Sequence, residues 1–100
     1  MVEIITGQSI VVVTRQQRSA DLESGEKIIL NLKDGVYYSL NEVARRIWEL
    51  FQEPRRVNQV IEILTAEYDI DSDRCTKELY ELLADLASRG LIEITNEAAA

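Results

Sequence analysis

The sequence predicts a small α+β domain in which three N-terminal β-strands precede three α-helices. Residues 10–40 hold runs of β-branched residues and alternating apolar residues, the pattern of half-buried strands. From Val43 onward, apolar residues recur every three or four positions, as on one face of a helix. Strands and helices that are separated along a chain favour an α+β arrangement over an alternating parallel sheet. With 100 residues, the chain is expected to form a single domain over 1–100, with a folded core at about 10–94.

Three segments are expected to form the strands, and a tight turn is expected to join the last two. The strands cover residues 10–15, 26–33 and 36–40, and the polar segment 16–25 is expected to be a loop. At Asp34-Gly35, a two-residue turn competes with a three-residue loop that places Gly35 in a left-handed bulge. We expect the three-residue loop, because it gathers the apolar residues of both strands on one face. It pairs Leu32 with Val36, Leu30 with Tyr38 and Ile28 with Leu40.

Three apolar stripes predict helices of about 11, 12 and 18 residues. The stripes consist of Val43, Ile47, Leu50 and Phe51, then Val57, Val60, Ile61, Leu64 and Tyr68, and finally Cys75, Leu79, Leu82, Leu83 and Leu86. A short strand is expected at residues 91–95, followed by a frayed tail at 96–100.

Capping residues mark the helix ends. The first helix begins either with Ser39 in a capping box or with Asn41 as its N-cap, and Pro54 ends it. The third helix is expected to begin at Asp71 or the next residue, because acidic side chains in a first turn interact favourably with the positive end of the helix dipole. Gly90 is expected to close this helix in the left-handed conformation.

Two helices joined by a short turn, beside a β-hairpin, form the winged helix-turn-helix arrangement, which makes DNA binding one candidate function. The charge argues against it. Residues 1–50 carry 7 acids and 6 bases, residues 51–100 carry 11 acids and 5 bases, and the net charge is −7. The third helix has three bases against five acids, so its exposed face would repel a phosphate backbone. A winged-helix transcriptional regulator is therefore the alternative function, and we expect no nucleic-acid partner.

The sequence contains few residues that could act as catalysts or metal ligands. The chain has no histidine, and its single cysteine, Cys75, lies on an apolar stripe where a small core residue is expected. Asp69, Asp71 and Asp73 alternate as in a calcium loop, but the required later Gly and Glu are replaced by Arg74 and Tyr80. We therefore expect no enzyme activity, no catalytic residues, no metal and no cofactor. The longest apolar run is far below the roughly 18 residues of a membrane span, so we expect a cytoplasmic protein without a membrane partner.

The strand at 36–40 is expected to be the edge of its sheet. An edge strand presents unpaired N–H and C=O groups that can accept an extended peptide as an added strand. Tyr37 and Tyr38 could then form walls for apolar side chains of the peptide, or they could be ordinary strand residues. A small acidic domain with an edge-strand docking site is as far as these patterns lead.

The residues also resemble a known family, the PqqD-like proteins. The run 26–41, which closes with Tyr37-Tyr38-Ser39-Leu40-Asn41, is typical of this family. Three further matches are Ala44 with Ile47, Trp48 and Leu50, then Tyr68-Asp69-Ile70-Asp71, and finally Leu86 with Gly90, Leu91 and Ile92. The resemblance implies a winged helix-turn-helix domain that recognises the precursor peptide of a ribosomally synthesised and post-translationally modified peptide (RiPP). Such a non-catalytic module captures the leader segment by β-strand addition and presents the precursor to a modifying enzyme.

The resemblance also implies where the leader peptide binds. The strand side of the site corresponds to Val36, Tyr37, Tyr38 and Ser39, and the helix side to Cys75, Glu78, Leu79 and Leu82, with Lys77 placed to meet a leader carboxylate. The implied partner is a radical-SAM enzyme in a quinone-cofactor pathway, or a leader peptidase and a cyclase in a lasso-peptide pathway. The tyrosine-rich strand resembles the stand-alone proteins of lasso-peptide clusters, and the N-terminal proline motif of quinone-cofactor members is missing. Arg56 stands where the family often has a Ser or Thr cap.

Overall fold

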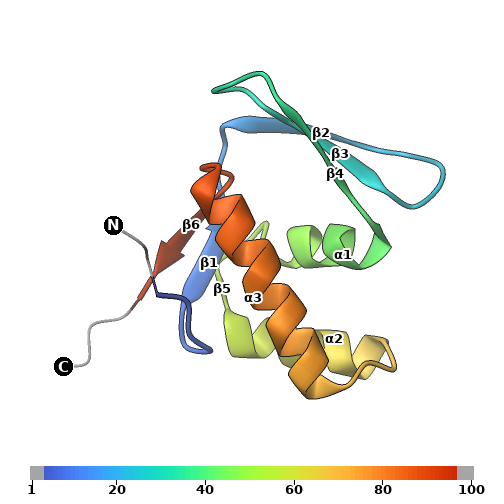
Figure 1. Cartoon of the computed structure of the whole chain (residues 1–100), viewed down its shortest axis with the longest axis vertical. Helices are drawn as coiled ribbons and strands as arrows, with labels where there is room; N and C mark the ends of the chain where they lie inside the picture. Colours follow the sequence, from blue (N-terminus) through green and yellow to red (C-terminus); the bar gives the residue numbers. More distant parts are fainter. Residues whose placement is uncertain (1–3, 97–100) are drawn as a thin grey trace.

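The computed structural model describes residues 4–96, which contain six strands and three helices (Figure 1). In chain order they are β1 Ile10–Val13, β2 Gln17–Asp21, β3 Lys27–Asn31, β4 Tyr37–Leu40, α1 Glu42–Leu50, β5 Arg55–Arg56, α2 Val57–Glu67, α3 Ser72–Ser88 and β6 Ile92–Thr95. The prediction of a mixed α+β domain with three helices is confirmed. The predicted order of three strands followed by the helices is wrong, because four strands precede α1 and β5 lies between α1 and α2.

The strands form two small antiparallel sheets. One has the order β5-β1-β6, and the other has the order β2-β3-β4. In Figure 1, α1 and α3 lie on one side of the β2-β3-β4 sheet, while β6 packs against α3 and β1 pairs with β6. The short strand expected at 91–95 is confirmed as β6, and it holds the chain end against β1. Most of the expected tail, residues 97–100, lies outside the described residues.

Residues 16–25 were expected to be a loop, but residues Gln17–Asp21 form strand β2. Every residue of β2 pairs with β3, from Gln17 opposite Asn31 to Asp21 opposite Lys27. Four of its five residues are exposed, so β2 carries no apolar alternation that sequence could reveal. Pairing with a neighbour, rather than local propensity, makes this segment a strand.

The hairpin between β3 and β4 has a different register from the one expected. Ile29 lies opposite Tyr38 and Lys27 opposite Leu40, so neither register considered from the sequence is correct, although Gly35 has the expected left-handed conformation with a φ of 72°. The loop is one residue longer than the expected bulge, and Ile29 and Asn31 face the interior while Leu32 is half exposed. The buried Asn31 amide donates to the Arg89 carbonyl at 2.9 Å and accepts from the Lys33 N–H at 3.0 Å. These bonds satisfy a buried polar side chain and anchor the register.

The three helices cover the predicted apolar stripes, and residues adjacent in sequence cap their ends. Of the two N-caps considered for α1, the structure has Asn41, whose side chain accepts from the Ala44 N–H at 2.8 Å. Asp71 caps α3. Gly90 has a φ of 73°, and the Leu91 N–H returns to the Leu86 carbonyl at 3.0 Å, which closes α3 in a Schellman motif.

One core lies between the helices and both sheets. Its largest fully buried side chains include Trp48 and Phe51 from the end of α1, packed with aliphatic residues from α2, α3 and the sheets. Cys75 belongs to this core, as the sequence predicts. The core therefore fixes α1 and α3 relative to β4, which places the two sides of the candidate site.

Candidate functional site

Strand β4 is an edge of its sheet among the residues that the structure describes. The Asn31 N–H donates to the Val36 carbonyl at 2.9 Å, so this carbonyl points toward β3, while the Val36 N–H donates to Asp34 Oδ1 at 2.9 Å. Because these directions alternate along an antiparallel strand, Tyr38 also bonds to β3, while the N–H and C=O groups of Tyr37 and Ser39 point to the open side. The edge therefore offers two donors and two acceptors at alternate residues.

Side chains of β4 alternate between the two faces of the sheet. Tyr38 and Leu40 face the helices and pack with the core, whereas Tyr37 is 67% exposed on the opposite face. The Ser39 hydroxyl donates to the Glu26 carboxylate at 3.2 Å on that outer face. Of the four strand residues named from the sequence, Tyr38 thus turns toward α3, while Tyr37 and Ser39 present their backbone to the edge.

The end of α3 contacts β4 through Arg89. Its Nη1 donates to the Tyr38 hydroxyl at 2.7 Å, and its guanidinium carbon lies 4.3 Å from the centroid of the Tyr38 ring. Its Nε donates to Asp85 Oδ1 at 3.0 Å. The hydrogen bonds to Tyr38 and Asp85 raise the pKa of Arg89. Sequence reasoning missed this contact, because Tyr38 and Arg89 are 51 residues apart and neither carries a local signal.

A pocket of about 190 Å³ lies between the start of α1 and the first half of α3. Its lining is mainly apolar and consists of Asn41, Val43, Ala44, Ile47, Leu64, Ile70, Cys75, Glu78, Leu79 and Leu82. All four helix-side residues named from the resemblance, from Cys75 to Leu82, are in this lining, and Lys77 is exposed outside it. Asn41 directly follows the last residue of β4, so the pocket adjoins one end of the open edge.

The pocket holds no activated nucleophile. Burial and the nearby Glu78 carboxylate raise the pKa of the Cys75 thiol, which disfavours its thiolate. Over residues 4–96, no cluster of three or more metal-ligating side chains occurs. None of the helices in this range is long and apolar enough to span a bilayer.

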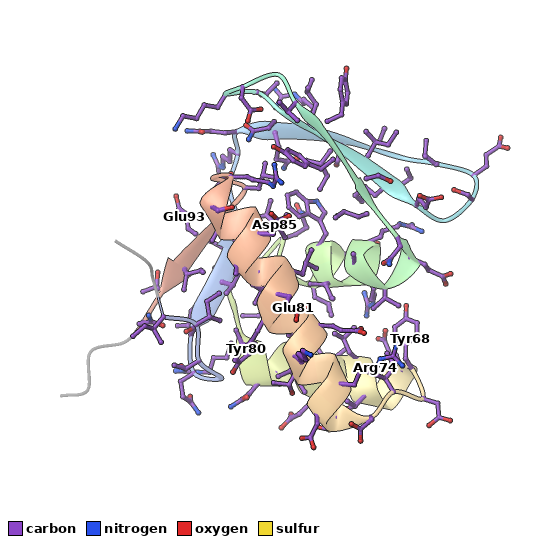
Figure 2. The ribbon with its side chains drawn as sticks, viewed as in Figure 1. Tyr68, Arg74, Tyr80, Glu81, Asp85 and Glu93 are labelled. Atoms are coloured by element: carbon purple, nitrogen blue, oxygen red, sulfur yellow. The ribbon has the colours of Figure 1, made fainter. Side chains whose placement is uncertain are left out.

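The exposed face of α3 is dominated by acids and ion pairs. Figure 2 shows Arg74, Glu81 and Asp85 spaced along this helix. Arg74 lies 3.0 Å from Glu78, and Arg89 lies 3.0 Å from Asp85, so two of the three bases counted on this helix are paired with its own acids. The face provides no row of bases for a phosphate backbone.

An open strand edge beside an apolar pocket defines a domain suited to binding extended peptides. Residues 26–92 match the family model of Coenzyme PQQ synthesis protein D (PqqD), and the chain belongs to this family. A solved structure described as TbiB1 in complex with the TbiA(beta) leader peptide is similar to the chain, with a TM-score of 0.75 and 29% sequence identity. The match covers 86% of this chain and 99% of that chain. No curated protein sequence matches. The resemblance inferred from the sequence is thus confirmed at the level of the family.

Proposed function

We propose that this protein is a RiPP recognition element that binds the leader of a precursor peptide as an added antiparallel strand on β4. The open edge of β4 carries the proposal, and the similarity to TbiB1, a protein solved in complex with a leader peptide, supports it. The main-chain groups of Tyr37 and Ser39 pair with the leader, and Val36 and Tyr38 flank them. We further propose that α2 and α3 with the neighbouring strands form a winged helix-turn-helix.

An apolar leader side chain fills the pocket between α1 and α3. At about 190 Å³ this pocket is smaller than the roughly 300–1,000 Å³ of small-molecule sites, which suits a single side chain better than a metabolite. Cys75, Leu79 and Leu82 give it an apolar wall, and Glu78 stands in its lining as a polar group. Lys77, which is exposed and directly precedes Glu78 in α3, meets a carboxylate of the leader.

The protein acts as an adaptor rather than as a catalyst. By holding the leader, it raises the effective concentration of the precursor at a modifying enzyme. That enzyme is a radical-SAM enzyme in a quinone-cofactor pathway, or a leader peptidase and a cyclase in a lasso-peptide pathway. The tyrosine-rich strand favours the stand-alone lasso-peptide type. A cytoplasmic location, where precursor peptides are made, follows from this role.

Fluorescence anisotropy of a labelled leader peptide, taken from the nearest short reading frame, tests the proposal. Saturable binding at micromolar concentration or below is expected. A labelled DNA duplex is the control, and it should give no binding at low salt. Absence of leader binding by a folded protein, or DNA binding that weakens steeply with salt, would contradict the proposal.

A further inference from the structure

The end of the β3–β4 hairpin gathers exposed apolar side chains in an otherwise well-buried domain. Leu32 is 49% exposed, Val36 is 44% exposed and Tyr37 is 67% exposed. Only two other large apolar residues in the described part of the chain reach comparable exposure, Ile4 and Leu22. In Figure 1 the helices lie on one side of the β2-β3-β4 sheet, and no ribbon covers its outer side. This part of the surface has no partner within the described chain.

Cations without ion pairs gather at the same end of the sheet. Among the described residues, four basic side chains form no ion pair, and three of them are Arg15, Arg18 and Lys33. Arg18 lies opposite Leu30, which in turn lies opposite Tyr37, so these three residues form one row across the outer face. Arg15 precedes Gln16, whose carbonyl accepts from the Leu32 N–H at 3.0 Å. The turn also holds Asp34, whose carboxylate accepts from the Val36 N–H, so cations outnumber acids here in a chain of net charge −7.

We propose that this surface, the hairpin face, docks the modifying enzyme through an apolar patch of that enzyme with an acidic rim. The hairpin face consists of Arg15, Arg18, Leu32, Lys33, Val36 and Tyr37. The inference rests on the proposed leader binding, because Val36 and Tyr37 border the edge where the leader would pair. A leader on β4 extends the same sheet, so the enzyme meets the protein and the bound leader on one continuous surface.

The test uses the 100-residue chain, a labelled leader and the purified enzyme that modifies the corresponding precursor. Leu32→Ser and the double variant Arg18→Glu/Lys33→Glu change the hairpin face without touching the residues assigned to leader binding. Leu22→Ser is the apolar control, because Leu22 is 40% exposed at the opposite end of the same sheet. Arg74→Glu is the charge control. It replaces an exposed base on α3 by an acid, the same change of charge as one of the two hairpin-face substitutions.

The hairpin-face variants should weaken enzyme binding by about tenfold or more and slow precursor processing, while the leader Kd stays within about twofold. Both control variants should behave as the wild type. Enzyme binding that is unchanged in the hairpin-face variants, or absent in the wild type with bound leader, overturns the inference while leader binding stands. If the wild type forms a dimer that Leu32→Ser disrupts, the hairpin face serves self-association, and the inference is overturned as well. Failure of the leader to bind at all contradicts the proposed function itself.

Discussion

The two edges of the β2-β3-β4 sheet offer the same backbone chemistry in different surroundings. The Leu22 N–H bonds to Glu26 and the Leu32 N–H to Gln16, so alternation turns the main-chain groups of Ser19 to the open side of β2. Ser39 does the same on β4. Beside β4, however, lie Tyr38, Arg89 and the pocket of α1 and α3. The β2 edge is polar and exposed.

This difference matters because an open strand edge by itself supplies affinity for a peptide without selectivity. Main-chain hydrogen bonds accept any extended peptide, whereas pockets for alternate side chains select one. The pocket beside the β4 edge is mainly apolar, whereas the hollow that Gln17 and Arg18 of β2 help to line is mainly polar. The comparison therefore predicts that equal changes on the two edges have unequal effects on leader binding.

The largest effect is expected from proline at the outward position of each edge. Ser39→Pro removes an N–H that the leader would bond and leaves the pairing with β3 intact, since proline is tolerated at edge positions that face solvent. Leader affinity should fall by about 30-fold or more, equivalent to about 2 kcal/mol, in anisotropy titrations. Ser19→Pro is the matched variant on β2 and should leave the affinity unchanged.

Ser39→Ala separates the backbone from the side chain. It removes the hydroxyl that bonds Glu26 but keeps the N–H. Its leader affinity should stay near that of the wild type. Equal losses in Ser39→Pro and Ser19→Pro would mean that the β4 edge is not the docking strand.

A smaller effect is expected from filling the pocket beside β4. Ala44→Leu adds three carbon atoms to the half-buried lining and should weaken leader binding by about tenfold, because an apolar leader side chain loses its space. Ala84→Leu, at an exposed position of α3 outside the lining, is the control. Unfolding followed by the fluorescence of the buried Trp48 checks that both variants fold. Unchanged affinity in Ala44→Leu would remove the pocket from the binding site.

A modest effect is expected where α3 contacts β4. Arg89→Met keeps an unbranched apolar stem but loses the hydrogen bonds to Tyr38 and Asp85 and the contact with the ring. Leader affinity should fall by about threefold, because Tyr38 is held less firmly beside the edge. Arg74→Met breaks only the exposed pair with Glu78 and should change neither affinity nor stability measurably. Equal behaviour of the two variants would show that Arg89 does not position β4.

The sequence predicted the parts of the fold that depend on local residues. Helix stripes, the Asp71 cap and the left-handed Gly90 each follow from a few adjacent residues, and the structure has all of them. The hairpin register depends instead on Asn31, whose buried amide bonds the Arg89 carbonyl across 58 residues. In a sequence, a polar residue such as Asn31 predicts an exposed position. The apolar pattern therefore indicated the wrong buried face for β3.

The candidate site likewise has parts that the sequence could predict and parts that it could not. The edge position of β4 and the apolar stripe of α3 could be inferred from patterns and from the resemblance. Their geometry could not, because the pocket is completed by Val43, Ala44 and Ile47 from α1, which the sequence assigned only to the core. Which main-chain groups of β4 point outward depends on the register, and a shift of one residue reverses it.

The smallest effect is expected at the β2 edge, where Asp21 contacts Lys27 at 2.8 Å and Arg45 at 3.3 Å. The hydrogen bond from Lys27 lowers the pKa of Asp21 in the folded protein. Its contribution to stability is therefore complete above the ordinary carboxyl pKa of 3.8 and is lost as the pH falls through the lowered value. Asp21→Asn should flatten the acid side of the stability profile, measured by denaturant unfolding between pH 2 and 6 (roughly the range in which carboxyl groups titrate). Leader affinity at pH 7 should not change, and a loss there would mean that the β2 edge also takes part in binding.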